Sequence, residues 1–186
     1  GLILFGVVLA FSARFTAPQG VAVDGSGNVY VAEGNFIVRK ITPQGSVSTF
    51  AGIAGDNRIF KDPIGIAVDD GGNVFVTDRY KIHKITHQGV ISPVAGTDYV
   101  IGHADGAGTN AAFYNPNGLV PDRFGNLYVA DSDNNTIRKV LPDGNVQTFA
   151  GSPSINENVD GPTSTARFMS LKSFAFDNSG NLYVSS

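Results

Sequence analysis

One phrase recurs four times in this chain of 186 residues, and that repetition limits the possible folds more than any other feature of the sequence. The copies are "GNVYVAEG" at 27–34, "GNVFVTD" at 72–78, "GNLYVAD" at 125–131 and "GNLYVSS" at 180–186. They follow one another at offsets of 45, 53 and 55 residues. Periods of this order indicate a solenoid, a propeller or an array of repeats. Each copy therefore predicts one structural unit.

The first half of each unit predicts a β-hairpin. A short apolar strand ends in Asp, and Gly follows three residues later, as at Asp24 and Gly27. A short carboxylate that accepts backbone N–H groups, with a Gly at positive φ, forms a tight turn. The aligned aspartates are Asp24, Asp69, Asp122 and Asp177. The repeated phrase is the second strand, and its apolar residues on both faces predict burial between two neighbouring layers.

The second half of each unit predicts another pair of strands. The third strands are "FIVRKI" at 36–41, "YKIHKI" at 80–85 and "NTIRKV" at 135–140. The fourth strands are "VSTFAG" at 47–52, "ISPVAG" at 91–96 and "VQTFAG" at 146–151. Pro93 lacks a backbone donor, which favours an outer, partly unpaired position for this last strand.

Four strands per unit, with no helix-length amphipathic pattern, predict an all-β fold. We expect a β-propeller built of four-stranded antiparallel blades, because stacked blades bury one another's apolar faces. The chain would hold three full blades and part of a fourth, so the propeller would be incomplete. The expected blade units are about 13–52, 53–96, 97–151 and 152–186.

Two long connections between units resemble each other. Residues 97–113 and 152–168 align without a gap, with Asp-Gly at the ninth and tenth positions and A-x-F at the end. Connections of this length are unusual in a compact domain. Their matched length predicts a defined excursion over one face of the blades.

The first twelve residues are treated separately from the blades. Residues 2–11 read "LILFGVVLAF", an apolar run too short to cross a bilayer, so we expect no stable membrane span. The segment 1–12 is either a strand of a preceding blade or an export or anchor remnant. A strand there would leave unpaired blade edges, through which the chain would self-associate.

Composition narrows the function classes. A hydrophobic content of 42% can form a substantial core, which argues against disorder. The formal charge of −3 and pI near 5.5 predict no nucleic-acid partner, which would need a concentrated positive field. The chain has no Cys, so disulfides and thiolate chemistry are excluded, while the compartment stays open.

The segment 131–136, "DSDNNT", imitates the start of a calcium loop. Asp131, Asp133 and Asn135 have the right spacing, but the later Gly and bidentate Glu of such a loop are missing. We interpret the segment as an Asp/Asn-rich hairpin turn. Asn134 also begins an N-x-T sequon, which has meaning only in a chain secreted by a eukaryote.

The basic and imidazole side chains do not suggest a catalytic or metal set. His83 occupies the third-strand position of Arg39 and Arg138, whereas His87 lies in a turn and His103 in a long connection. Metal ligands must converge on one point, so we predict no metal, no cofactor and no catalytic residue. The Arg-Lys pairs are interpreted as a solvated edge of the outer strands.

The repeats also resemble a known family. "FTAPQGVAVDGSGNVYVAEGNFIVRKITPQGSVSTFAG" and "FYNPNGLVPDRFGNLYVADSDNNTIRKVLPDGNVQTFAG" are similar to NHL repeats, and "DGAGTNAAF" is similar to the linkers of secreted and bacterial NHL proteins. The resemblance covers residues 13–186. It implies a β-propeller, which in this family usually has six blades.

Two functions remain open at this point. The first is a non-catalytic scaffold that binds a protein or a glycan through its inter-strand and inter-blade loops. The expected partner-binding residues are Arg79, Tyr80, Tyr99 and Asn134, and the expected location is extracellular or periplasmic. The alternative is part of a metal-dependent six-bladed propeller hydrolase or lyase, similar to a lactonase, whose active-site residues lie outside this sequence.

Overall fold

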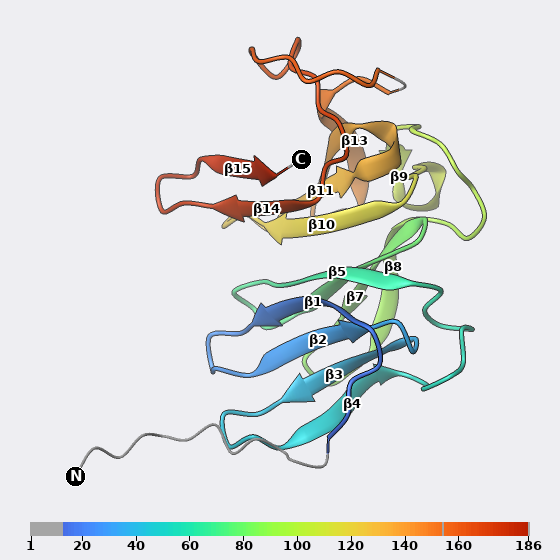
Figure 1. The fold of residues 1–186 in the computed structure, drawn as a ribbon, viewed down its shortest axis with the longest axis vertical. Coiled ribbons are helices and arrows are strands. Elements are labelled where there is room, and N and C mark those ends of the chain that lie inside the picture. The colour runs from blue at the N-terminus through green and yellow to red at the C-terminus, as the bar shows by residue number, and fades with distance from the viewer. Residues whose placement is uncertain (1–12, 154, 186) are drawn as a thin grey trace.

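The computed structural model describes residues 13–153 and 155–185, which fold into antiparallel sheets (Figure 1). The first sheet contains β1 (Pro18–Val23), β2 (Val29–Glu33), β3 (Ile37–Ile41) and β4 (Val47–Gly52), in that order. The second contains β5 (Pro63–Val68), β6 (Val74–Asp78), β7 (Lys81–Ile85) and β8 (Ile91–Gly96). The predictions for residues 1–12 fall outside the described residues.

The third and fourth sheets repeat this plan. The third contains β10 (Pro116–Pro121), β11 (Leu127–Asp131), β12 (Thr136–Val140) and β13 (Asn145–Gly151), with β9 (Gly106–Ala107) added beyond β13. The fourth contains β14 (Ser173–Phe176) and β15 (Leu182–Ser185). Two short 3₁₀ turns complete the elements, η1 (Gly108–Asn110) and η2 (Ser132–Asn134). The predicted three full blades and part of a fourth are confirmed.

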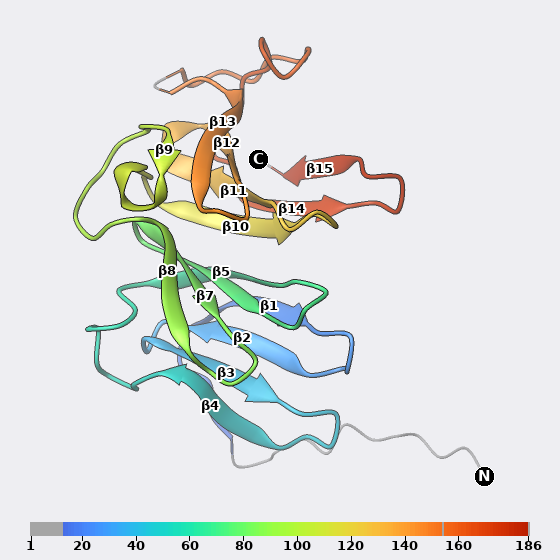
Figure 2. The same ribbon diagram turned by 180° about the vertical axis from the view of Figure 1, so that it is seen from behind.

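The four sheets follow one another in chain order along one axis, and the described part of the chain does not close into a ring (Figures 1 and 2). The first strands of successive sheets adjoin, β1 against β5, β5 against β10, and β10 against β14. Gly65 makes this approach possible, because a Cβ there would collide with the carbonyl oxygen of Asn117 on the next first strand. Gly20 and Gly118 occupy the same position in their own sheets.

The second strand of each complete sheet is buried, as the repeated phrase predicted. Every residue of β6 and β11 is buried, and only the first residue of β2 is partly exposed. Apolar clusters fill the spaces between successive sheets. The first sheet differs on one side. Val21 is 65% exposed, whereas the aligned Ile66 and Leu119 are buried. Val23 is 60% exposed, whereas the aligned Val68 and Pro121 are half-buried.

All four predicted Asp turns are present at one end of the sheets, which we call the turn end (residues 24–28, 69–73, 122–126 and 177–181). In the first turn, Asp24 Oδ1 accepts the backbone N–H groups of Ser26 and Asn28, and Asn28 Nδ2 donates to Asp24 Oδ2 at 2.7 Å. Gly27 has a φ of 80°. These turns are closed by their own residues. Burial opposes ionisation of Asp24, but the Asn28 bonds outweigh it and lower the pKa of that carboxyl.

The opposite end holds the β2–β3, β6–β7 and β11–β12 turns and the links between sheets; we call it the connection end. The long connection 97–113 runs along its own sheet, where β9 pairs with the outer strand β13. Gly106 pairs with Val146 and Ala107 with Asn145. The excursion predicted from the matched connections is therefore held in place as a fifth strand.

Candidate functional site

A buried acid ends the second strand of each complete sheet, at Glu33, Asp78 and Asp131. Each one accepts backbone N–H groups from the connection that leads into its own sheet. Glu33 Oε2 accepts from Thr16 at 2.8 Å, and Asp131 Oδ1 accepts from Tyr114 at 2.7 Å. A carboxylate that accepts main-chain donors fixes the course of the loop that carries them. These acids therefore position the connection end.

Asp78 performs this task in the second sheet. Its Oδ1 accepts the N–H of Lys61 at 2.8 Å and the N–H of Asp62 at 2.6 Å. The next residue along the chain, Arg79, begins the β6–β7 turn. Asp78 therefore fastens the connection before β5 against the turn after β6, and it brings Lys61 next to Arg79.

Each acid also lies next to a basic side chain, an arginine or a histidine, in the middle of the third strand. Arg39 Nη1 lies 3.4 Å from Glu33 Oε1, and Arg138 Nη1 lies 2.8 Å from Asp131 Oδ2. Histidine takes the same position in the second sheet, where His83 Nε2 lies 3.2 Å from Asp78 Oδ2.

The interpretation of the Arg-Lys pairs 39–40 and 138–139 as a solvated edge is wrong for Arg138, and the other three residues are partly buried. Arg138 is fully buried and His83 is 5% exposed, because the connections leading into their sheets cover them. The neighbouring lysines lie on the other face of the strand. Lys40 Nζ lies 5.4 Å from the centre of the Tyr30 ring, and Lys139 Nζ lies 5.5 Å from that of Tyr128. Their aliphatic stems cover aromatic residues of the second strands.

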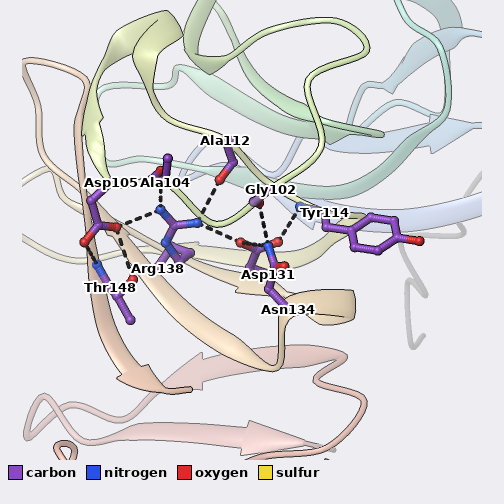
Figure 3. A network of polar contacts seen from close by, with 9 residues as sticks. All are labelled: Gly102, Ala104, Asp105, Ala112, Tyr114, Asp131, Asn134, Arg138 and Thr148. Carbon is purple, nitrogen blue, oxygen red and sulfur yellow. Dashed lines mark hydrogen bonds and ion pairs between the residues drawn. The ribbon is translucent and has the colours of Figure 1, made fainter. Parts of the chain in front are cut away.

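Arg138 is the centre of the polar network shown in Figure 3. Its Nη1 donates to the carbonyl oxygen of Ala112 and its Nη2 to that of Ala104, both at 2.9 Å. Nη2 also lies 2.8 Å from Asp105 Oδ1, and Asp105 in turn accepts from the N–H and the hydroxyl of Thr148. One buried guanidinium thus joins the connection 97–113 to its sheet.

Asn134 belongs to this network and not to the molecular surface. It is buried, and its Nδ2 donates to Gly102 O at 2.7 Å and to Asp131 Oδ2 at 2.8 Å. The segment "DSDNNT" forms the predicted hairpin turn, in which Asn135 adopts the left-handed conformation with a φ of 57°. Across residues 13–153 and 155–185, no three His, Cys, Asp or Glu side chains gather as a metal site.

Burial raises the pKa of the Asp131 carboxyl to about 6, although bonds from Asn134, Tyr114 and Arg138 lower it. Removing a carboxylate from water disfavours its charged form. The proton affinity of this acid is therefore higher in the folded chain than in the unfolded one.

The other three predicted residues, Arg79, Tyr80 and Tyr99, come together at the connection end of the second sheet. Arg79 Nε donates to the Tyr80 hydroxyl at 3.1 Å, and its guanidinium lies 5.4 Å from the centre of the Tyr80 ring. Lys61 Nζ lies 5.9 Å from the centre of the Tyr99 ring, which is 73% exposed. We call Lys61, Arg79, Tyr80 and Tyr99 the aromatic–basic patch.

Unusual backbone conformations gather at the same end. Non-glycine residues with positive φ in the described ranges lie in the connections and turns of the connection end: Ala17, Phe36, Arg79, Tyr99, Asn115, Asn135 and Ser170. Such conformations persist where surrounding contacts fix them, and they concentrate at functional sites. Two of these seven residues, Arg79 and Tyr99, belong to the aromatic–basic patch.

Sequence reasoning missed the Arg138 network and the role of Lys61. Two signals for the network were present: the third-strand Arg recurs at 39 and 138, and the Asp-Gly pair at 105–106 recurs at 160–161. Lys61 carried no signal, because the contact between Lys61 and Tyr99 joins different loops.

The family model of the NHL repeat matches residues 60–86, which span β5, β6 and β7. The chain carries an NHL repeat. The other complete sheets have the strand order of the matched one. None of the curated proteins matches this chain. Among the described residues, no helix is long and apolar enough to cross a bilayer.

Solved structures share the fold of this chain. A Bacteroides thetaiotaomicron protein of unknown function is 22% identical, with a TM-score of 0.80 over 91% of this chain and 44% of that one. An auxiliary nutrient binding protein from the same organism is 19% identical, with a TM-score of 0.74 over 89% and 44%. An inactive virginiamycin B lyase from Staphylococcus aureus is 15% identical, with a TM-score of 0.64 over 94% and 50%. This chain spans about half the length of these proteins.

Proposed function

We propose that this chain is part of a non-catalytic NHL propeller that binds a protein or glycan ligand through its connection end. The ligand would contact the aromatic–basic patch. The observation that carries the proposal is a pair of cation–aromatic contacts, Lys61 with Tyr99 and Arg79 with Tyr80. These residues come from three separate segments, and the N–H of Lys61 bonds to Asp78, the residue before Arg79. Arg79 and Tyr99 are exposed, and the other two are partly buried. Binding sites on repeat folds are carried by such variable loops on a rigid scaffold.

The patch has the chemistry of a recognition site. Tyrosine and arginine dominate binding energies at interfaces, because they offer a broad apolar surface together with polar groups. The hydrogen bond between Arg79 and Tyr80 limits the motion of both side chains before any ligand arrives. Less conformational entropy is then lost on binding. The hydrogen bonds that the Lys61 N–H donates to the Asp78 carboxylate hold the Lys61 segment next to the turn that carries Arg79 and Tyr80.

Two further points support the proposal. Structures with the same fold include an auxiliary nutrient binding protein from Bacteroides thetaiotaomicron and another from Bacteroides ovatus, the latter at 20% identity and a TM-score of 0.71. We also propose an extracellular or periplasmic location, which the apolar segment 1–12 and the similarity to secreted NHL linkers favour.

The proposal is tested by titrating the ¹⁵N-labelled chain with defined neutral and acidic oligosaccharides and with a peptide library. Ligand-induced shifts are expected at Lys61, Arg79, Tyr80 and Tyr99. For the ligand found, Tyr99→Ala should weaken binding by about tenfold or more, as loss of an interface anchor does.

Phe124→Ala is the matched control, since Phe124 is 70% exposed but lies at the turn end. It should leave the affinity unchanged. Shifts confined to the turn end, or equal losses in both variants, would contradict the assignment. Turnover of a lactone by the chain would contradict the proposal that the propeller is non-catalytic.

A further inference from the structure

A cleft of about 600 Å³ lies at the turn end, between the Asp turns of the third and fourth sheets. The first strands of these sheets, β10 and β14, lie side by side (Figures 1 and 2). Residues of both turns line the cleft, together with Asp70 from the turn of the second sheet and Tyr128 from β11. We call it the turn-end cleft. Its volume falls in the range of small-molecule sites, about 300–1,000 Å³.

The turn of the third sheet carries two large side chains that the other Asp turns lack. Asp122 closes this turn by accepting the backbone N–H groups of Phe124 and Asn126 and the side-chain amide of Asn126, so the side chains of Arg123 and Phe124 are not needed for it. Phe124 is 70% exposed, and the Arg123 guanidinium lies 4.9 Å from the centre of its ring. The aligned positions hold Gly25 and Ser26, Asp70 and Gly71, and Asn178 and Ser179.

Tyr128 supplies an unpaired hydroxyl to the turn-end cleft. The aligned hydroxyls of Tyr30 and Tyr183 donate to the Asp of their own turns, at 3.2 Å and 3.3 Å. Tyr128 lacks the corresponding bond to Asp122, and its hydroxyl has no partner in residues 13–153 and 155–185. Its ring is buried and packs edge-to-face against Phe176 at 5.4 Å. Polar groups of buried side chains are nearly always hydrogen-bonded, so this hydroxyl is a position for a ligand atom.

Both signs of charge line the turn-end cleft. The carboxylates are those of Asp70, Asp122 and Asp177, and the cation is Arg123. An anionic ligand would be repelled by the three carboxylates, and a cationic ligand would compete with Arg123 for the ring of Phe124. A neutral ligand rich in hydroxyl groups meets neither obstacle, because each hydroxyl both donates and accepts.

We propose that the turn-end cleft binds a neutral saccharide of one or two rings. The C–H face of a sugar ring packs against Phe124. Hydroxyls of the sugar donate to the carboxylates of Asp70 and Asp122, and its oxygens accept from Tyr128 and Arg123. An aromatic surface together with a few fixed polar groups is typical of small-molecule sites. This site does not depend on the ligand proposed for the aromatic–basic patch.

The proposal is tested by titrating the ¹⁵N-labelled chain with neutral sugars, namely glucose, galactose, mannose, maltose and cellobiose. At least one should give saturable shifts of the amides of residues 122–126 and 177–181. Its affinity should not change when sodium chloride is added, since the ligand carries no charge. Glucuronate and spermidine serve as acidic and basic probes. Saturation of these amides by a charged probe alone, or by no probe, overturns the proposal.

Tyr128→Phe removes only the hydroxyl, and the fold accepts it, because Phe75 occupies the aligned position of β6. It should weaken saccharide binding by roughly fivefold, as loss of one hydrogen bond does. Tyr30→Phe is the matched control, since the Tyr30 hydroxyl lies in the first sheet and is bonded to Asp24. It should leave the affinity unchanged. Equal affinities of Tyr128→Phe and the unmodified chain overturn the proposal.

Phe124→Ala separates this site from the aromatic–basic patch. It should weaken saccharide binding at the turn end by about tenfold or more and leave ligand-induced shifts of Lys61 and Tyr99 unaffected. Tyr99→Ala should have the reverse effect. Failure of one site therefore leaves the response of the other intact. Turn-end shifts that keep their full affinity in Phe124→Ala overturn the proposal.

Discussion

Single residues decide how closely the blades stack and how the connections are held. Gly65 on β5 lies directly against β10, the first strand of the next sheet. Its N–H donates to Thr77 Oγ1, and the Thr77 hydroxyl donates to Asn117 O at 2.7 Å. Arg138 and Asp131 form an ion pair between two side chains that are both fully buried. Removal of the Asp131 carboxylate from water outweighs the attraction of Arg138 and raises the pKa of that carboxyl to about 6. Both features give predictions at this scale.

Gly65→Ala should destabilise the chain by roughly 3 kcal/mol, because the new methyl group has no space against Asn117 and Thr77. Urea denaturation measures the change. Gly25→Ala is the control, since a Cβ at Gly25 would meet no atom within 4 Å. Equal effects of the two substitutions would contradict the close approach of β5 and β10.

Asp131 should make stability fall as the pH rises. Its folded pKa of about 6 lies above the ordinary aspartate value of 3.8, so the folded chain binds this proton more tightly than the unfolded chain does. The contribution of Asp131 is then fully present below about pH 4 and lost above about pH 6, a change of about 3 kcal/mol. Carbon-13 NMR of the Asp131 carboxyl should show a midpoint near pH 6. A midpoint below pH 4 would refute this.

At the scale of elements, the connection 97–113 behaves as part of its sheet. Backbone pairing between β9 and β13 and the side chain of Asp105 hold it from two directions. Asp105 is half exposed, so its ion pair with Arg138 is weakened by solvent screening. The connection should therefore loosen locally when Asp105 is changed, while the sheet itself persists.

Asp105→Asn should speed amide exchange at Gly106 and Ala107 by roughly fivefold, which corresponds to a local loss of about 1 kcal/mol. Exchange in β11 should stay unchanged, since that strand is buried on both faces. Asp133→Asn is the control, an exposed acid in the η2 turn between β11 and β12. Faster exchange throughout the third sheet would contradict a role of Asp105 that is confined to the connection 97–113.

At the scale of the whole molecule, the first sheet has one face that the described residues leave uncovered. Val21 and Ile66 hold the same register position in their sheets, but only Ile66 is buried. Ile66→Thr should therefore cost about 2–3 kcal/mol, because it removes apolar contacts and buries a hydroxyl. Val21→Thr should cost less than about 0.5 kcal/mol. Thermal unfolding of the two variants checks the contrast, and similar losses would show that the Val21 face is covered in solution.

The repeat allowed most of the fold to be predicted, because strand pairing within each blade joins residues close together in the sequence. The Asp turns, the buried second strands and the edge position of Pro93 all follow from local patterns. Arg138 could not be placed this way. An Arg-Lys pair on a strand is typical of solvent exposure, and only the distant segment 104–112 buries it. The same limit applies to Lys61 and Asn134, whose contacts join different loops.

Because each Asp turn is closed by hydrogen bonds among its own residues, the two ends of the sheets should tolerate amino-acid substitutions differently. Asp177 accepts from Ser179 and Asn181 within five residues, and the hydrogen bonds to Asn181 lower its pKa. Substitutions at that end stay confined to one hairpin. At the other end a carboxylate such as Asp78 serves two segments, so any replacement must satisfy both at once. The amino-acid sequence should therefore vary freely at the turn end. At the connection end, binding specificity can change only at side chains that point outward.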